Sequence, residues 1–289
     1  MKVSKAVIVA AGLGTRMLPA SKAVPKEILP ILDRPAIQLV VEEAVAAGIR
    51  DIVLIVSPGR TTVLDHFGPA PELERHLAAR GKHEMLAQIR KIGALAKFTA
   101  VEQEQPLGLG HAVLQARRAV GGEPFAVMLP DDIFDCPRPC LGQMLAMAER
   151  LDAPVVALLK VAKSEVSKYG IVSGDRIEER LYRLTGMVEK PAPEKAPSEL
   201  AIVGRYVLPP EIFEILAHGR PGAGGEIQLT DALIELARRR PLYGYEFEGT
   251  RYDIGDPLGF LTAQIGFGLK HPDFADSFRA YLRMIVSAL

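Results

Sequence analysis

A glycine-rich turn followed by spaced cations is the first group of residues that could do chemistry. An apolar run over residues 6–11 leads directly into Gly12-Leu13-Gly14-Thr15-Arg16, and Lys26 follows within Pro25-Lys26-Glu27. Glycines let backbone N–H groups approach phosphate oxygens, which a Cβ would obstruct. Arg16 and Lys26 can neutralise several phosphate charges. The pattern predicts a site for a nucleoside triphosphate.

Two other phosphate-binding motifs do not fit this turn. The dinucleotide motif Gly-x-Gly-x-x-Gly would require glycine at position 17, where the chain has Met17. The P-loop ending Gly-Lys-Ser/Thr is also absent at the required spacing. A Gly-x-Gly pair alone is more often a plain tight turn. The downstream cations favour phosphate, and the missing third glycine disfavours an NAD enzyme.

Carboxylates follow two other apolar segments. Asp131 and Asp132 end the run Leu129-Pro130-Asp131-Asp132, and Asp253 follows a short strand-like piece. A carboxylate at the carboxyl end of a central strand lies where α/β sheets bind ligands. Two carboxylates and substrate phosphates form a common Mg²⁺ site, because this ion prefers oxygen ligands. An isolated Asp-Asp pair could equally begin a turn.

A glutamine and a Glu-Lys pair complete the set of polar candidates. The amide of Gln103 can donate and accept at once, which matches the imide edge of uracil. Glu189 and Lys190 are adjacent, and such a pair on a strand is usually a solvated face. Neighbouring strand residues point to opposite faces, so both can serve one ligand only if the strand end is kinked. Pro191 makes a kink plausible.

The composition limits what the chain can bind. Of 289 residues, Lys and Arg number 35, as do Asp and Glu, so no global field favours nucleic acid or an anionic membrane. No apolar stretch reaches the ~20 residues of a membrane helix, and the N-terminal run is short for a signal peptide. We therefore expect a cytoplasmic protein. Cys136 and Cys140 are expected to be reduced thiols without a metal.

Alternating strand and helix patterns predict how these residues are positioned. Helical patterns fall between apolar runs that read as strands, which favours a doubly wound, Rossmann-like sheet that is mixed but mainly parallel. The expected strands are residues 6–11, 51–57, 98–103, 125–130 and 152–161. The expected helices are residues 36–47 and 109–119, with a long polar helical stretch at 72–93.

The pattern changes after about residue 160. Short strand-like pieces at 170–173, 184–189, 201–208 and 242–247 predict an added small β region. Helices at 258–269 and 274–288 close the chain. We expect a single domain over residues 1–289, with a nucleotide-binding core at about 1–160, a sugar-phosphate region at about 161–255 and C-terminal helices at about 256–289 that could serve oligomerisation.

The run AAGLGTRMLPASKAVPKEILP resembles the N-terminal motif of the sugar-nucleotide pyrophosphorylases, which are nucleotidyltransferases with a Rossmann-like sheet. Its Pro-Lys-Glu form is similar to the uridylyltransferases among them. The resemblance continues in the same order along nearly the whole chain. The matching segments are GLGHAV at 108, LPDD at 129, YGIV at 169, VEKP at 188, AIVGRYVL at 201, GEIQLTD at 225 and YDIGDPLG at 252.

The resemblance implies a role for each motif residue. Asp131 and Asp253 would bind Mg²⁺, while Asp132 remains a neighbour. The cations implied to act on the phosphates are Arg16, Lys26 and Lys190. Nucleotide contacts are implied for Ala11, Gly12, Gly14, Thr15, Glu27, Gln103 and Gly108. Sugar-phosphate contacts are implied for Gly170, Glu189, Lys190 and Gly204.

The resemblance also implies a reaction. UTP and α-D-glucose 1-phosphate would give UDP-glucose and pyrophosphate with Mg²⁺ as cofactor, in a homodimer or homotetramer. Three alternatives remain open: use of dTTP or CTP, use of another sugar 1-phosphate, and a catalytically silent paralogue that regulates an active partner. One departure concerns the base-binding loop, because Glu102 stands where the family pattern leads us to expect Arg.

Overall fold

The structure is a computed structural model that describes residues 1–219, 222 and 225–288. A nine-stranded sheet forms its centre, in the order β5-β4-β1-β6-β11-β8-β12-β10-β9. Its strands are β1 (Lys5–Ala10), β4 (Asp51–Val56), β5 (Lys97–Glu102), β6 (Phe125–Met128), β8 (Val155–Lys160), β9 (Gly170–Glu178), β10 (Leu181–Glu189), β11 (Leu200–Leu208) and β12 (Tyr243–Glu246).

One half of the sheet is parallel, as the sequence predicted. β5, β4, β1 and β6 pair side by side in the same direction. The continuous apolar runs of β4, β1 and β6 suit strands that are covered on both faces, whereas β5 is an edge strand without buried residues. In β1, for example, Ala6 and Ile8 enter the core on one face, whereas Val7 enters the core on the other. The parallel half therefore places the carboxyl ends of four strands at one edge.

The other half corrects the prediction of a mainly parallel sheet, and the added small β region proves to be part of that sheet. β11 is antiparallel to both β6 and β8, and β10 is antiparallel to β12 and β9, so only the β8–β12 pair is parallel there. These strands extend the same sheet, which curls until β9 also pairs with β11. Of these antiparallel neighbours, β9 and β10 follow each other directly as a hairpin, whereas β11 pairs with β6 and β8, and β12 pairs with β10, across longer stretches of chain.

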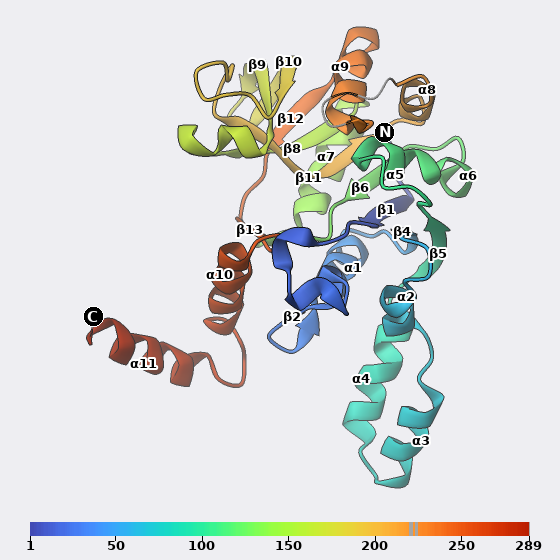
Figure 1. The fold of residues 1–289 in the computed structure, drawn as a ribbon, viewed down its shortest axis with the longest axis vertical. Helices are drawn as coiled ribbons and strands as arrows, with labels where there is room; N and C mark the ends of the chain where they lie inside the picture. The colour runs from blue at the N-terminus through green and yellow to red at the C-terminus, as the bar shows by residue number, and fades with distance from the viewer. Residues whose placement is uncertain (220–221, 223–224, 289) are drawn as a thin grey trace.

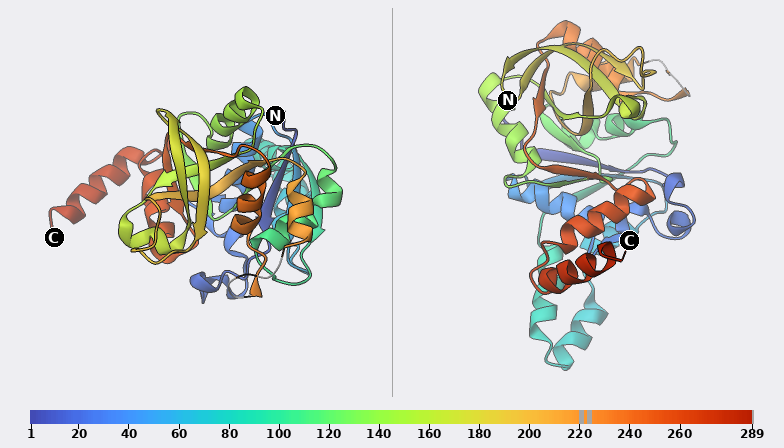
Figure 2. Two further views of the ribbon diagram at one scale, coloured as in Figure 1. Left: turned by 90° about the horizontal axis from the view of Figure 1, so that it is seen from above. Right: turned by 90° about the vertical axis from the view of Figure 1, so that its left-hand side faces the viewer.

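Helices cover both faces of the sheet (Figure 2). One face is packed by α1 (Ala36–Ala46), α2 (Thr62–Phe67), α7 (Cys140–Leu151) and α10 (Pro257–Gly268). The opposite face is packed by α5 (Leu109–Gln115), α6 (Arg117–Val120), α8 (Ile212–Ala217) and α9 (Leu229–Arg239). The helix predicted over residues 109–119 is therefore interrupted, with Ala116 between α5 and α6.

Two helical segments project from this body (Figure 1). The predicted polar stretch forms α3 (Pro71–Ala79) and α4 (His83–Gly93), which turn at Gly81 with φ +65°. The second segment is α11 (Ala275–Val286), and none of the residues of α11 is buried. No helix in the described part of the chain is both long and apolar enough to cross a membrane.

Short elements shape the region around the polar candidates. They are the 3₁₀ turns η1 (Thr15–Met17), η2 (Ala20–Lys22), η3 (Lys26–Ile28) and η4 (Lys163–Lys168), and the two-stranded ribbons β2 (Pro30–Ile31) with β3 (Arg34–Pro35) and β7 (Asp132–Asp135) with β13 (Thr250–Asp253). The β7–β13 ribbon matters most, because it pairs Asp132 with Asp253.

Candidate functional site

The predicted phosphate loop lies between β1 and η1. Gly14 has φ +67°, and a Cβ there would lie 3.2 Å from Ser21 Cβ and 3.5 Å from Lys26 Cβ. Ser21 Oγ donates to Gly14 O at 2.7 Å. Glycine is needed at this position for its conformation and for the close approach of the following segment. The loop is thereby packed against the turn that carries Lys26, while Gly12 and Thr15 remain exposed.

Lys26 and Arg16 converge on Asp131. Lys26 Nζ donates to Asp131 Oδ2 at 2.5 Å, and Arg16 Nη2 lies 3.8 Å from the same oxygen. Burial lowers the pKa of Lys26, but the nearby carboxylates outweigh it and raise that pKa. Burial likewise raises the pKa of Asp131, but Lys26 and Arg16 more than offset it, so that this pKa is lowered. Both groups are therefore charged at neutral pH.

Asp131 and Asp253 meet although they are far apart in the sequence. Ile254 N–H donates to Asp131 O at 2.8 Å, which ties the end of β6 to the end of β13. Gly255 N–H donates to Asp253 Oδ1 at 3.0 Å, and a Cβ at Gly255 would lie 2.6 Å from Arg16 Nη2. Oxygen ligands of this kind fit Mg²⁺. Among the described residues, no third His, Cys, Asp or Glu completes a metal-binding group with them.

Arg251 is a functional candidate that sequence reasoning missed. Its Nε donates to Asp132 Oδ1 at 2.6 Å, its Nη2 to Asp253 Oδ2 at 3.1 Å and its Nη1 to Tyr169 Oη at 3.0 Å. Gly204 N–H donates to the second oxygen of Asp132 at 2.7 Å. Asp132 is thus held by protein groups, and Arg251 fixes the direction of Asp253. The only hint in the sequence was that Arg251 lies two positions before Asp253.

A buried ion pair, Arg205 with Glu43, holds the backbone around Asp131 and Asp132. Arg205 is fully buried, and its Nη2 donates to Glu43 Oε2 at 2.6 Å. The same guanidinium donates to three backbone oxygens, those of Leu129, Gly204 and Asp132, at 2.8–3.0 Å. A buried guanidinium needs this degree of hydrogen bonding. Arg205 therefore fixes the backbone on either side of Asp131, a role that AIVGRYVL did not reveal.

The sugar-phosphate candidates lie across the cavity. Lys190 has φ +45°, so the end of β10 is kinked as the joint use of Glu189 and Lys190 requires. Thr230 Oγ1 donates to Glu189 Oε2 at 2.7 Å, and a Cβ at Gly170 would lie 3.1 Å from that oxygen. Glu189 faces inward, whereas the Lys190 side chain is 58% exposed and its Nζ lies 3.5 Å from Glu189 Oε1.

The base-binding candidates follow the strands at the far end of the parallel half. Gln103 comes after β5, is 6% exposed, and donates through Nε2 to Gly108 O at 3.1 Å. Gly108 has φ +98°, and a Cβ there would lie 2.9 Å from Ile227 O. Ser57 Oγ donates to Ala11 O at 2.9 Å, which links the ends of β4 and β1.

Glu27 lies deeper than a ligand-contacting residue would be expected to lie. It is 1% exposed, and within the described part of the chain neither of its carboxylate oxygens has a hydrogen-bond partner. Burial raises the pKa of this carboxyl from its usual 4.5 to about 7, although Lys26 opposes the shift. An unpaired buried carboxylate is costly. Glu27 therefore reduces the stability of this region.

One cavity of about 500 Å³ gathers much of this chemistry. Among the predicted residues, those that line it are Arg16, Asp131, Gly170, Glu189, Gly204 and Asp253. Arg251, Tyr169 and Thr230, which the sequence did not single out, line it as well. The remaining predicted residues lie around the phosphate loop and the ends of β1 and β5, apart from Lys190 at the end of β10.

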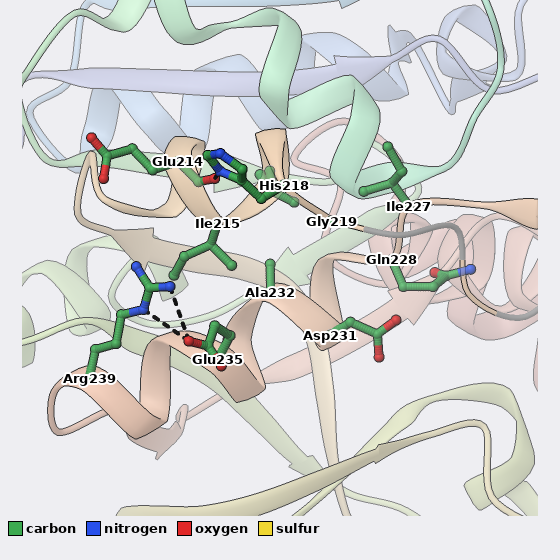
Figure 3. Close-up of a pocket in the computed structure, with 11 residues that line it drawn as sticks. Glu214, Ile215, His218, Gly219, Ile227, Gln228, Asp231, Ala232, Glu235 and Arg239 are labelled. Carbon is green, nitrogen blue, oxygen red and sulfur yellow. Dashed lines mark hydrogen bonds and ion pairs between the residues drawn. The ribbon is translucent and has the colours of Figure 1, made fainter.

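A second cavity of about 450 Å³ lies between α8 and α9 (Figure 3). Its carboxylates are Glu214, Asp231 and Glu235, and its guanidinium, Arg239, is already bonded to Glu235 at 3.0 Å. The cavity with Asp131 also holds carboxylates, but it is lined by three cationic side chains, those of Arg16, Lys168 and Arg251. The cavity with Arg16 and Asp131 is therefore the better candidate for a polyphosphate substrate.

Comparison with known proteins places the chain in a family. The family of nucleotidyl transferases matches residues 5–266. The chain is 48% identical to the UTP–glucose-1-phosphate uridylyltransferase YngB of Bacillus subtilis, over 99% of this chain and 96% of the relative. It is similar to UTP-bound UGPase from Acinetobacter baumannii, with TM-score 0.90, 38% identity and coverage of 97% and 99%.

A UDP-glucose pyrophosphorylase complexed with UDP-glucose is also similar, with TM-score 0.85 and 41% identity over 93% of this chain and 100% of that chain. These likenesses span both the parallel half of the sheet and the antiparallel half. The chain therefore belongs to the nucleotidyl transferase family and, within it, to the UTP–glucose-1-phosphate uridylyltransferases.

Proposed function

We propose that this protein joins UTP and α-D-glucose 1-phosphate to form UDP-glucose and pyrophosphate. The observation that carries the proposal is the convergence of Lys26 and Arg16 on Asp131, a residue that lines one cavity together with Asp253 and Glu189. This cavity offers cations for a triphosphate beside carboxylates for a metal and a sugar. The UTP and UDP-glucose bound by the two similar structures support the same substrate pair.

The nucleophile needs no general base. The second pKa of a phosphate monoester is about 6, so the sugar phosphate is largely dianionic at pH 7. Its oxygen would attack the α-phosphorus of UTP in line, and the bond to the pyrophosphate group would break. The main task of the protein is to hold two anions together and to stabilise the charge that develops between them.

The residues divide this task. Arg16 and Lys26 would neutralise the triphosphate and its leaving group, and Lys190 would position the attacking phosphate. Mg²⁺, when held by Asp131 and Asp253, would supply further positive charge to the phosphate oxygens. Lys26 contacts Asp131 in this structure, and a phosphate oxygen of the bound substrate would replace Asp131 as one of its partners.

The two halves of the sheet would divide the substrates. Residues at about 1–160 would form a Rossmann-like core for the nucleotide, with Ala11, Gly12, Gly14, Thr15, Glu27, Gln103 and Gly108. Residues at about 161–255 would bind the sugar phosphate through Gly170, Glu189, Lys190 and Gly204. The exposed apolar side chains of α11, among them Tyr281, Met284 and Val286, would be covered by a second copy in a homodimer or homotetramer.

The decisive experiment measures pyrophosphate release with each pair drawn from UTP, dTTP, CTP and several sugar 1-phosphates, with and without Mg²⁺. We expect the highest kcat/KM for UTP with glucose 1-phosphate, and no turnover without a divalent ion. A higher kcat/KM for another pair would reassign the substrates. No product from any pair would indicate a silent paralogue and overturn the proposal.

A further inference from the structure

Gln103 is held by a histidine that the proposed function does not use. Gln103 Nε2 donates to Gly108 O at 3.1 Å and lies 3.0 Å from Nδ1 of His111, on the first turn of α5. The amide is almost wholly enclosed, and both contacts involve its nitrogen end. Its direction decides which groups of a base it can meet.

Gly108 O determines that direction. A backbone carbonyl can only accept, so the amide atom that faces it must be the nitrogen. The second proton of this nitrogen then points to His111 Nδ1, which must be the unprotonated ring nitrogen. Nε2 of His111 therefore carries the ring proton. It lies 3.1 Å from the amide nitrogen of Gln115, whose oxygen would take that position after a half-turn of its terminal torsion, with loss of the longer contact of 3.4 Å from this nitrogen to His111 O.

We propose that His111 sets the base preference of the site by keeping the Gln103 oxygen turned toward the nucleotide. Neither contact uses Oε1 of Gln103, which leaves that oxygen for the base. A carbonyl oxygen accepts from N3–H of uracil or thymine, but it meets a lone pair at N3 of cytosine. The inference rests on the proposed role of Gln103 in base recognition. It makes His111 a positioning residue for selection against CTP.

Removal of the histidine acceptor should weaken this selection. A reversed amide would offer its nitrogen to the cytosine N3, but it would lose both contacts of Nε2. Without His111 only the contact to Gly108 O opposes the reversal. One neutral hydrogen bond changes an equilibrium by about tenfold. The effect falls on the ratio of kcat/KM for UTP to that for CTP, which a general loss of packing would not change.

The test measures this ratio for the wild type and three variants, with glucose 1-phosphate as the second substrate. His111→Phe should lower the ratio about tenfold, because it removes the acceptor. His111→Asn should stay near the wild type, because its oxygen can occupy the place of Nδ1. His66→Phe is the matched control, since His66 is also half-buried and bonded to a glutamine amide, that of Gln38 at 2.9 Å.

Gln103→Ala separates failure of the inference from failure of its premise. If Gln103→Ala lowers the ratio but His111→Phe leaves it unchanged, the role of His111 is overturned and that of Gln103 stands. If neither variant changes it, Gln103 does not read the base, although UTP turnover would still support the overall function. If His111→Asn lowers the ratio as far as His111→Phe, the acceptor is not the cause and the inference is overturned.

Discussion

Two ion pairs contact the segment around Asp131 and Asp132 and differ in what surrounds them. In the first pair, Lys26 contacts Asp131, and Asp131 lines the cavity. Arg205–Glu43 lies beneath, with the guanidinium fully buried and bonded to three backbone oxygens. The same kind of contact therefore lies beside open cavity space in one place and is enclosed by protein in the other. The buried pair fixes the backbone, and the pair beside the cavity is the one that we propose to act on the substrate.

The largest effect is expected when the buried pair is broken. Arg205→Ala leaves Glu43 buried without its partner, and such a change costs about 3–5 kcal/mol. Denaturant unfolding of the variant would measure the loss. The double variant Glu43→Leu/Arg205→Met removes both charges and should recover the part of that free energy that is due to the unpaired carboxylate, while the three backbone oxygens still lack their donor. If the double variant is as unstable as Arg205→Ala, an unpaired charge is not the cause.

Lys26→Ala should separate activity from stability. Loss of a charge directed at the transition state costs on the order of 3 kcal/mol, or roughly a hundredfold in kcat/KM. The unfolding midpoint should fall less than that of Arg205→Ala, because Asp131 lines the cavity and keeps Arg16 nearby. Lys91→Ala, on the projecting helix α4, is the matched control and should keep full activity. Near-normal turnover by Lys26→Ala would remove Lys26 from the mechanism.

Glu27→Gln tests whether the buried carboxyl next to Lys26 lowers the stability of the folded protein. Burial raises the pKa of Glu27 to about 7, so between about pH 4.5 and 7 the unfolded chain releases a proton that the folded chain keeps. The wild type therefore loses stability as the pH rises through this range. The variant should gain about 1–3 kcal/mol over the wild type between pH 5 and pH 8. Parallel stability curves for the two proteins would contradict this account.

The smallest effect is expected at a surface pair. Arg150 Nη2 donates to Glu178 Oε2 at 2.9 Å, and both side chains are largely exposed. Arg150→Ala should change the unfolding free energy by less than about 1 kcal/mol, because water screens such a pair. Thermal unfolding of Arg150→Ala and Arg205→Ala under the same conditions would compare the two losses of stability. A loss as large as that of Arg205→Ala would show that burial does not separate the two pairs.

The sequence predicted the parallel half of the sheet better than the rest. Continuous apolar runs such as β1 and β4, separated by amphipathic helices, have few alternatives to buried parallel strands. Beyond residue 160 the strands were found but their partners were not, because antiparallel pairing between β11, β8 and β6 depends on contacts that no local pattern encodes. The added small β region that the sequence predicted is therefore part of one curled sheet.

Residue types and spacing by themselves determined the glycine turn, its cations, the carboxylates after β6 and β13, and the motifs that carry the family resemblance. Such features are local, since a positive φ or a charge can be read at its own position. Three contacts were decided by the tertiary structure alone. Ile254 ties Asp131 to the neighbourhood of Asp253, and Arg251 orients the Asp253 carboxylate. Arg205 holds the backbone of the segment that follows β6. Ile254 and Asp131, like Arg205 and Leu129, are far apart in the sequence. Arg251 and Asp253 are two positions apart, but Asp132 and burial hold Arg251 in place, and only the folded chain provides these.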